Sequence, residues 1–454
     1  MIQPQRLKSL NAKDIRPGDY VLYWMQASAR AAANHALEYA ILRANERRQP
    51  CLAFFGLTDR FPEANARHYA FLLEGLRQTK LDLAANGVQL VVRRISPEKG
   101  VLEMARRASL VVVDRGYLRV QKAWREAAAG LLACPLVQVE SEAVVPVETA
   151  SPKEEWAAAT FRPKIRKLLA EYLVPLRERR PVKDSLGLEF ESLDLEDAEV
   201  VLGSLPVDRT VRPSPFYHGG AVEAKKRLRD FLRRKLDHFA DLRNNPALDH
   251  LSHLSPYLHF GQVSPLQVAL AVAAAESPGR EAFLEELIVR RELALNFVHY
   301  NPGYDTFEAV PAWARRTLQA HRSDDRPSTY SLEELEAGRT HDPYWNAAQR
   351  EMVATGKMHG YMRMYWGKKI LEWSPTPEKG FAAALALNNK YELDGRDPNG
   401  FAGVAWCFGK HDRPWQERKI FGQVRSMTDQ GLRRKFDIDR YVRRVEELEA
   451  RPKP

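Results

Sequence analysis

Cysteine is scarce in this chain of 454 residues, which contains only Cys51, Cys134 and Cys407. None of them belongs to a CxxC pair, so a disulfide scaffold and a zinc ribbon are excluded. No apolar run approaches the roughly 18 residues that a membrane span requires, which excludes a membrane channel. HExxH and GxxxxGK(S/T) motifs are missing too, and the sequence favours no particular order of a Ser-His-Asp catalytic triad. Metalloprotease, P-loop and hydrolase chemistry therefore have no signature, and no metal site is expected.

A secretion signal is also missing. The first residues, MIQPQRLKSLNAKDIRP, contain no apolar stretch, so we expect a cytoplasmic protein or one associated with the nucleoid. Hydrophobic residues make up 44% of the chain and charged residues 28%, which is typical of soluble globular proteins. At about 100–200 residues per domain, the length predicts two to four domains.

Positive charge exceeds negative charge. The 69 Lys and Arg residues oppose 59 Asp and Glu residues, which gives a net charge of +10. Such an excess permits attraction to nucleic-acid phosphates, although many basic proteins bind no nucleic acid. The segment 184–199 is acidic, whereas the segment 413–444 is dense in Arg and Lys. This asymmetry predicts one basic face, formed by the C-terminal part.

Residues 18–147 alternate short apolar runs with longer amphipathic stretches such as Arg30–Arg47 and Ala64–Ala85. This alternation predicts a doubly wound α/β domain with a parallel sheet over residues 1–147. The segment Met25–Arg30 that follows the first strand contains no glycine, so an NAD-type dinucleotide fingerprint is disfavoured. The expected strands are Asp19–Trp24, Cys51–Gly56, Val88–Ile95, Leu110–Val113 and Leu136–Val139.

The periodicity breaks over residues 148–215, where we expect one helix, Thr160–Tyr172, within a long solvated interdomain linker. From residue 216 to 454 the strand signal almost vanishes, which predicts an all-helical domain. The fold class is thus α/β followed by all-α. The expected helices of the second domain are Ala221–Phe239, Pro265–Ala275, Arg280–Tyr300, Leu332–Ala337, Asp342–Trp373, Thr376–Asn389 and Asp437–Ala450.

Two segments combine a structural pattern with groups that could bind a ligand. In Leu251–Gly261, Ser255 before Pro256 suits a helix N-cap, and the free N–H groups of a helix start attract anions. A plain capped helix explains the same residues. In Phe283–Phe297, five charged residues interrupt an apolar helix, a pattern that usually forms a solvated, salt-bridged face.

The segment Thr340–Trp373 has the highest density of aromatic and polar groups. Trp366 and Trp373 are seven residues apart and share one helix face, which suits either an aromatic core or a site. The segment 394–400, DGRDPNG, reads as two consecutive turns. Its two carboxylates beside Arg396 could equally hold a ribose or a guanidinium, and Trp406 could stack on a base.

Taken together, these segments resemble the class II cyclobutane pyrimidine dimer photolyases of the photolyase/cryptochrome flavoprotein family. The resemblance covers almost the whole chain. The motifs that carry it are YWMQASAR near the start, LSPYLHFGQVSP at Leu254–Pro265, FLEELIVRREL at Phe283–Leu293, THDPYWNAAQ at Thr340–Gln349, TGKMHGYMRMYWGKKILEW at Thr355–Trp373 and NNKYELDGRDPNGFAGVAWCFGKHDRPW at Asn388–Trp415.

The resemblance implies a helical domain that holds FAD, with light-driven electron transfer to a dimer flipped out of DNA. The residues that match flavin contacts are Ser252, Leu254 and Ser255 at the phosphates, the ion pair of Arg363 with Asp394, and Asn388 facing flavin N5. Those that match the lesion pocket are Glu286, Met364 and Trp406. The matching tryptophan chain that reduces the flavin is Trp366, Trp345 and Trp373, from proximal to distal.

The implied partner is double-stranded DNA carrying these dimers, bound by a monomer. Candidate phosphate contacts on the basic face are Arg243, Arg413 and Arg425. Two positions depart from the family pattern: Phe239 stands where relatives often have a tyrosine, and Arg290 stands where some have an aromatic ring beside the lesion. The α/β domain of such proteins can hold an antenna chromophore, but no residue pattern here says which.

Two alternatives remain open from the sequence. One is a cryptochrome-like photoreceptor that keeps flavin photoreduction but does not repair DNA. The other is a DNA-binding module without flavin.

Overall fold

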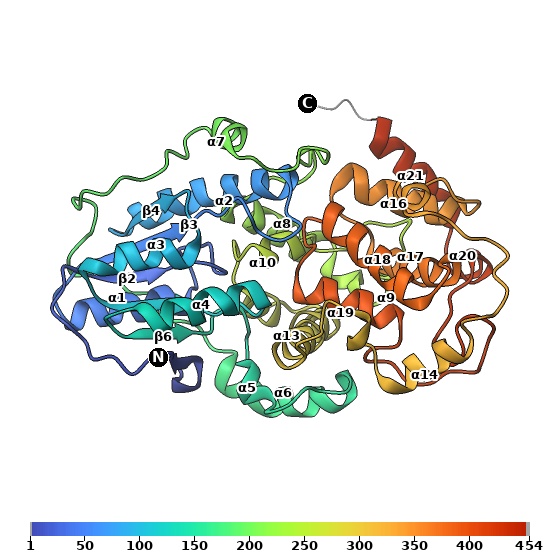
Figure 1. Cartoon of the computed structure of the whole chain (residues 1–454), viewed down its shortest axis with the longest axis horizontal. Coiled ribbons are helices and arrows are strands. Elements are labelled where there is room, and N and C mark those ends of the chain that lie inside the picture. The colour runs from blue at the N-terminus through green and yellow to red at the C-terminus, as the bar shows by residue number, and fades with distance from the viewer. Residues whose placement is uncertain (1, 451–454) are drawn as a thin grey trace.

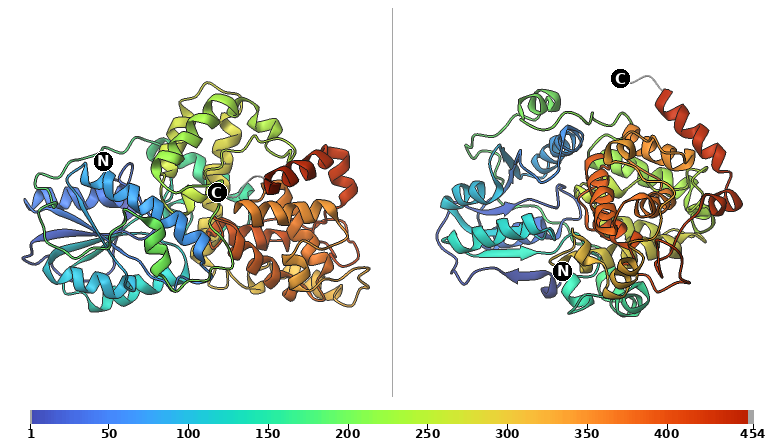
Figure 2. Two further views of the ribbon diagram at one scale, coloured as in Figure 1. Left: turned by 90° about the horizontal axis from the view of Figure 1, so that it is seen from above. Right: turned by 45° about the vertical axis from the view of Figure 1, so that its right-hand side comes forward.

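The computed structural model describes residues 2–450. A six-stranded sheet with its helices forms one half of the molecule, and helices alone form the other (Figure 1). Viewed from above, the sheet has helices on both of its faces (Figure 2). Within the described residues, no helix is both long and apolar enough to cross a membrane.

The sheet has the strand order β1-β6-β5-β2-β3-β4, and all its neighbouring pairs except β1–β6 are parallel. All five expected strands are present. The short antiparallel strand at one edge was not expected, because its three residues, LKS, are half-buried or exposed and lack an apolar run. The strands are β1 Leu7–Ser9, β2 Tyr20–Trp24, β3 Cys51–Gly56, β4 Gln89–Arg93, β5 Ala108–Asp114 and β6 Leu136–Val139.

Both faces of the sheet are covered, because side chains alternate along each strand. Val21 and Tyr23 of β2 pack in the apolar cluster that includes helices α1 (His35–Glu46) and α2 (Ala66–Ala84). Tyr20, Leu22 and Trp24 point to the opposite face, toward α3 (Pro97–Met104) and α4 (Arg119–Leu131). Every residue of β2 is buried, which explains its unbroken apolar sequence.

The segment between the two halves is mostly exposed, and it contains more than the one helix that we expected. It contains α5 (Val147–Ala150), α6 (Ala158–Tyr172) and α7 (Ala198–Ser204). Its acidic part returns to the edge of the sheet, where the Leu193 amide donates to the Val92 carbonyl at 2.7 Å. Leu195, Val201 and Leu205 are buried there. These apolar residues are spaced too irregularly among the acids to show a periodic pattern.

The second half is helical over its described residues. Its helices are α8 Ala221–Arg234, α9 Phe239–Leu242, α10 Ser255–His259, α11 Pro265–Ala273, α12 Arg280–Leu284, a π-helix at Glu285–Arg290, α13 Arg291–Tyr300, α14 Ala312–Ala320, α15 Leu332–Glu336, α16 Pro343–Thr355, α17 Gly360–Trp373, α18 Pro377–Tyr391, α19 Pro398–Cys407, α20 Asp429–Lys435 and α21 Ile438–Ala450. Short 3-10 turns lie at Pro4–Arg6, Ala105–Arg107, Leu236–His238 and Phe307–Ala309.

The single helix expected over 342–373 is two helices. Gly356 ends α16 with a φ of +82°, a left-handed conformation that suits glycine. The imidazole of His359 then caps α17 by accepting from the Tyr361 amide at 3.2 Å. Likewise, the expected helix over 280–300 contains the π-helix, and the second of the turns expected over 394–400 opens α19, which Asp397 caps. Periodicity alone does not reveal such breaks, since apolar positions continue across them.

Arg67, near the start of α2, ties the two halves together. Its buried guanidinium donates four hydrogen bonds of 2.6–3.2 Å to backbone carbonyls of Arg212, Met352, Val353 and Tyr391. These carbonyls belong to the last turns of α16 and α18 and to the segment before α8. One side chain thus satisfies helix ends that would otherwise be buried without partners.

We expect Arg67→Met to lower the stability of the protein by about 3 kcal/mol, because several buried carbonyls lose their donor. The thermal unfolding midpoint, compared with that of Arg60→Met, measures this. The Arg60 side chain is 94% exposed, so its replacement is a matched control. Equal midpoints for the two variants would show that Arg67 does not hold the interface.

Candidate functional site

A buried cluster of two cations and two carboxylates lies where α10, α17 and the end of α18 meet. Arg363 Nη2 lies 2.9 Å from Glu392 Oε1 and 3.2 Å from Asp394 Oδ1. Lys357 Nζ lies 2.6 Å from Asp394 Oδ2 and donates to Ser255 Oγ at 2.8 Å. The sequence resemblance implied only the pair of Arg363 with Asp394. The other members connect that pair to the start of α10.

Burial and charge act in opposite directions on the two carboxyl groups. Burial raises the pKa of Glu392 to about 7, although Arg363 and Lys357 oppose the shift. Burial would also raise the pKa of Asp394, but Lys357 and Arg363 outweigh it and hold that pKa well below its usual value. Asp394 is therefore the firmly ionised partner of the two cations.

The same cluster contains buried polar atoms that lack a partner. Arg363 Nε and Glu392 Oε2 make no hydrogen bond within the described part of the chain. Buried polar groups are nearly always hydrogen-bonded, so unpaired ones indicate that something else binds there. The donor set suits a polar, hydrogen-bonding ligand.

The loop before α10 has a constrained backbone. His253 has a φ of +56°, and its ring lies 2.9 Å from the Tyr217 hydroxyl and 2.5 Å from Asp249 Oδ1. These contacts fix Ser252 and Leu254 on either side of it. Ser255 is the first residue of α10 and not its N-cap as we expected; Leu254 occupies the cap position without a side-chain bond. The Ser255 hydroxyl instead accepts from Lys357.

Three tryptophans form a continuous ladder away from this cluster. The rings of Trp366 and Trp345 are stacked, with centroids 6.3 Å apart and planes 6° apart. Trp345 then meets Trp373 edge to face at 5.5 Å. The indole N–H of Trp345 donates to the Trp366 carbonyl at 3.0 Å, and that of Trp366 donates to Gln349 Oε1 at 2.9 Å. The three rings therefore form one series of neighbours, with Trp345 in the middle.

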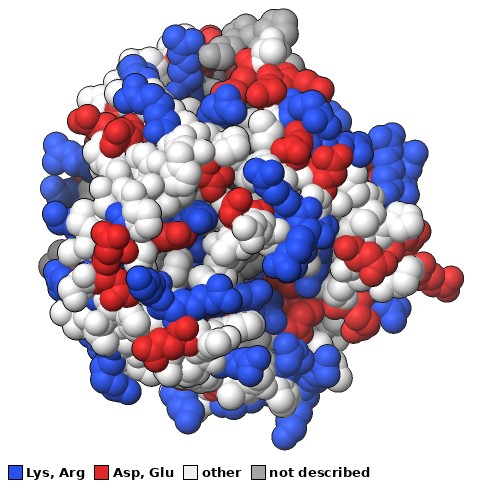
Figure 3. Space-filling model, turned by 90° about the vertical axis from the view of Figure 1, so that its right-hand side faces the viewer, with Lys and Arg blue, Asp and Glu red and all other residues white. Residues whose placement is uncertain are grey.

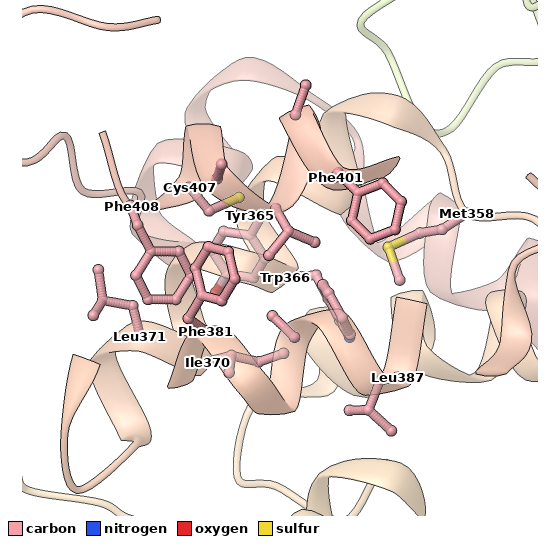
Figure 4. Close-up of a cluster of buried hydrophobic side chains, with 14 of the residues drawn as sticks. Met358, Tyr365, Trp366, Ile370, Leu371, Phe381, Leu387, Phe401, Cys407 and Phe408 are labelled. Carbon is pink, nitrogen blue, oxygen red and sulfur yellow. The ribbon is translucent and has the colours of Figure 1, made fainter. Parts of the chain in front are cut away.

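The ladder crosses the largest apolar cluster of the protein and ends near its surface. Trp366 lies among buried side chains that include Met358, Leu387 and Phe401 (Figure 4). At the other end, Trp373 lies 5.4 Å from the exposed ring of His341. These aromatic rings therefore belong to the hydrophobic core and at the same time form a connected series. The sequence left open whether they form a core or a site, and the structure is compatible with both.

Asn388 and Phe239, two positions that the resemblance placed near the flavin, are both buried in the helical half. The Asn388 amide donates to Asn389 Oδ1 at 3.1 Å. A Cβ atom on Gly400 would approach Asn388 Nδ2 to 3.1 Å, so the glycine lets α19 pack closely against this amide. Phe239 packs edge to face with Phe231 and Phe283, and it offers no hydroxyl group.

Glu286 lies on the π-helix and forms an ion pair with Arg243. Arg243, a candidate phosphate contact, is therefore paired with a carboxylate in this structure, and its side chain is 29% exposed. Arg290 is half exposed and lies 3.4 Å from Glu285. A π-helix shifts the side chains that follow it around the helix axis, and such turns are frequent at functional sites.

Trp406 lies within a group of cations and aromatic rings. Lys368 Nζ lies 4.8 Å from the centre of its ring and donates to the Cys407 carbonyl at 2.6 Å. Arg425 lies 5.8 Å from Trp406 and 4.9 Å from Trp415, over which Arg413 also stacks. Met364 is half-buried, and its carbonyl accepts a weak bond from the Cys407 thiol.

The end of the molecule formed by the helical half carries many Lys and Arg side chains around a hollow (Figure 3). Asp and Glu side chains lie on the same face, so its charge is mixed, with Lys and Arg gathered along the hollow. Two members of the charged cluster, Lys357 and Glu392, had no signal of their own in the sequence analysis. Each stands inside a resembling motif, but only the folded chain shows that these charges are buried together.

Arg396 lies in the chain between Asp394 and Asp397, the two carboxylates for which the sequence suggested a ribose or a guanidinium as partner. It is buried, has a φ of +59°, and donates to the Asn389 carbonyl at 2.9 Å. Its Nη1 also lies 2.8 Å from His68 Nε2 on α2. The guanidinium alternative holds for Asp394, whose partner is Arg363. Asp397 pairs with His259 at 3.0 Å.

An open cavity of about 1000 Å³ lies between the two halves. It is bordered by residues that follow β2, β3 and β5, among them Gln26 and Gly56. In doubly wound sheets ligands bind at this edge, outside the carboxyl ends of the strands. Its aromatic wall is formed by Phe55, Phe61, Tyr69, Tyr117, Trp124 and Phe260.

Comparisons with known proteins agree with this architecture. A family model described as DNA photolyase matches residues 21–182. The deoxyribodipyrimidine photo-lyase of Methanothermobacter thermautotrophicus is 56% identical over 451 residues, 99% of each chain. The protein of the same name from Arabidopsis thaliana is 38% identical, over 98% of this chain and 94% of its own.

Solved structures share the fold at low identity. An archaeal photolyase from Sulfolobus tokodaii, whose structure contains two FAD molecules, aligns with a TM-score of 0.71 and 18% identity over 95% of this chain and 91% of its own. A Synechocystis cryptochrome aligns with a TM-score of 0.72 and 16% identity over 97% and 91%. The fold is that of the photolyases and cryptochromes. With the identities above, the chain belongs to the DNA photolyase family.

Glu392 gives the site a pH dependence. Because its pKa is raised from 4.5 to about 7, the folded state binds more protons than the unfolded state between these values. Its contribution to stability therefore falls as the pH rises through this window, by about 3 kcal/mol at most. Glu392→Gln removes this titration. The variant does not lose this contribution as the pH rises, whereas the natural protein does. The difference in unfolding free energy between the two should therefore become smaller with rising pH.

Chemical denaturation over this pH range measures the effect, and Glu196→Gln, which replaces an exposed carboxyl, is the control. A difference between Glu392→Gln and the natural protein that stays constant with pH contradicts the raised pKa.

Proposed function

We propose that this protein is a light-dependent DNA repair enzyme that splits cyclobutane pyrimidine dimers, a deoxyribodipyrimidine photo-lyase of class II. The observation that carries the proposal is the 56% identity over 99% of the chain to a deoxyribodipyrimidine photo-lyase. The class II assignment rests on the sequence motifs, and the stacked pair of Trp366 with Trp345 supports it.

The buried cluster fits FAD as the cofactor. Arg363 Nε and Glu392 Oε2 offer an unpaired donor and acceptor for a flavin ring, and Ser252, Leu254 and Ser255 would lie at its phosphates. When bound in its reduced, light-excited form, FAD supplies the electron that opens the dimer. Asp394 keeps Arg363 and Lys357 in place, so the cationic side chains need not move when charge shifts. Asn388 would face flavin N5.

The tryptophan ladder carries electrons to the cofactor site in this proposal. Trp366 is the proximal donor, Trp345 refills it, and Trp373 accepts the oxidising equivalent next to the surface. The centroids of neighbouring rings are 5.5–6.3 Å apart, so the three rings form an unbroken series. Trp373 itself is buried, so an electron from a reductant in solution would enter past the exposed ring of His341, whose centroid lies 5.4 Å away.

The lesion would enter beside Glu286, Met364 and Trp406. Glu286 would exchange its Arg243 partner for the hydrogen-bonding edge of a flipped base, and Trp406 would contact the dimer. Arg413 and Arg425 would bind phosphates of double-stranded DNA, independently of sequence. Arg243, once released from Glu286, would join them. We propose that the enzyme acts as a cytoplasmic monomer.

The cavity between the two halves is proposed to bind a second, antenna chromophore. Its aromatic wall and its position at the switch point of the sheet favour a flat ring system. The second FAD of the Sulfolobus tokodaii structure is described as a light-harvesting cofactor of that protein. The lining residues here do not select one chromophore.

A cryptochrome-like photoreceptor is the second candidate, because a cryptochrome shares the fold at a TM-score of 0.72. Blue light on the purified protein with UV-irradiated DNA separates the two. Loss of dimers supports repair, whereas flavin photoreduction without loss of dimers supports the photoreceptor. A protein without a flavin absorption band contradicts both.

Trp366→Phe should abolish photoreduction of oxidised flavin, because the first link of the ladder is lost. Repair by protein that has been reduced chemically beforehand should stay close to that of the natural protein. Transient absorption measures the first property, and a dimer assay measures the second. Trp24→Phe, in the sheet core, is the control. Unchanged photoreduction in Trp366→Phe contradicts the electron path.

Arg425→Gln should weaken binding of lesion-containing DNA roughly tenfold and lower the salt dependence by about one phosphate contact. The reason is that Arg425 lies against the rings of Trp406 and Trp415, beside the proposed entry of the lesion, where its charge would meet the DNA phosphates. Fluorescence anisotropy at several salt concentrations measures both effects. Arg60→Gln, which removes a charge from the α/β half, is the control. An unchanged salt slope in Arg425→Gln removes it from the interface.

A further inference from the structure

A second pocket, outside the sites described above, lies between α4, the β1–β6 edge of the sheet and the end of α13. It has a volume of about 600 Å³ and is open to solvent. Its wall is rich in basic groups, with Lys8, Arg115, Lys122, Arg125 and His299 among the lining residues. The repair mechanism uses none of them.

Arg125 is the most unusual of these groups. Its side chain is buried, and Nη2 donates to the Gly116 carbonyl at 2.7 Å. Within residues 2–450 it forms no ion pair with a carboxylate. Burial lowers its pKa to about 10, and the nearby Arg115 adds to the shift. A buried cation that meets only a carbonyl oxygen is costly unless a negative charge joins it.

Lys122, one turn before Arg125 on α4, repeats this arrangement. Its Nζ donates to the carbonyls of Val298 and His299 at 3.4 and 3.0 Å, at the end of α13. No carboxylate lies within ion-pair distance of it among the described residues. Burial lowers its pKa to about 8, and Arg125 and Arg115 act in the same direction. The two cations therefore repel each other across the pocket.

The acids around the pocket are engaged elsewhere or exposed. Glu140 is the partner of Arg115 at 2.6 Å. Glu148 is shared by Lys8, Arg115 and His299 at 3.3–3.7 Å. Glu126, also in the wall, is exposed and forms no ion pair within the described part of the chain. The inner end of the pocket thus keeps two cations that form no ion pair with a carboxylate among residues 2–450, and only the longer-range attraction of Glu126 and Asp114 acts on them.

We propose that Lys122 and Arg125 bind an anionic group, a phosphate or a carboxylate, in this pocket. Either oxyanion would accept hydrogen bonds from both cations and compensate their buried charge. Arg115 borders this pocket and also the cavity between the two halves. The anion can therefore be free in solution, or it can be the charged end of a ligand whose rings lie in that cavity. The second source rests on the proposed chromophore, and the first does not.

The test is calorimetric titration of the full-length protein that carries one equivalent of bound FAD, so that the flavin site is filled and no excess FAD competes for the pocket. The three probes are inorganic phosphate, riboflavin 5′-phosphate and riboflavin, which lacks the phosphate. Lys122→Gln/Arg125→Gln removes both cations. Arg119→Gln is the matched control, because Arg119 lies on the same helix but pairs with Asp305 on the surface.

We expect at least one phosphate-bearing probe to bind: either inorganic phosphate, or riboflavin phosphate more tightly than riboflavin. That probe should bind the natural protein and the control at least about tenfold more tightly than it binds the double variant. Binding of phosphate alone identifies a free anion as the source, and a preference for riboflavin phosphate identifies a ligand tail. Arg125→Lys keeps the charge and should keep binding even if the Gly116 contact weakens.

The proposal is overturned if neither phosphate binds nor riboflavin phosphate is preferred. It is also overturned if the double variant, folded as judged by its unfolding midpoint, binds like the natural protein. Dimer repair is measured on the same samples, so that failure of the proposed function would appear separately from failure of this site.

Discussion

The helical half depends on one electrostatic constraint: two cations and two carboxylates must share a buried space. Removing four charges from water is expensive, and only close pairing offsets the cost. Arg363 and Lys357 achieve this by each meeting both Glu392 and Asp394. Because these residues come from α17, from the segment before it and from the end of α18, satisfying the charges also fixes where those elements meet. The loss of any one member would leave an excess charge among the other three, with fewer partners to offset its burial.

The same constraint reaches the domain interface. The backbone carbonyl of Glu392 lies 3.1 Å from His68 Nε2, and Arg396 contacts the same ring nitrogen. His68 belongs to α2, the helix from which Arg67 holds the ends of α16 and α18, and it also borders the cavity between the halves. One helix of the α/β half therefore supports both the charged cluster and one wall of the cavity. Its position sets the geometry of two sites.

The sequence predicts the parts of this architecture that leave a periodic trace. All five parallel strands are long apolar runs, and the shared face of Trp366 and Trp373 follows from their spacing. The edge strand Leu7–Ser9 and helix α7 are too short and too polar for such a trace. The break at Gly356 is hidden because apolar positions continue beyond it. Pairing is a property of the fold, so neither the Arg243–Glu286 pair nor the burial of Arg396 could be foreseen.

The position of the tryptophan ladder relative to the charged cluster has a physical consequence. The cluster is polar and ionised, whereas Trp345 and Trp366 are surrounded by apolar side chains, and their N–H groups are satisfied by fixed acceptors. A packed apolar interior has few dipoles that could reorient around a transient charge. A positive charge moving along the rings thus meets little reorganisation. When Glu392 is protonated, Arg363 and Lys357 face only the one negative charge of Asp394, and the net positive charge of the cluster repels it. The arrangement therefore favours movement of that positive charge outward, toward Trp373.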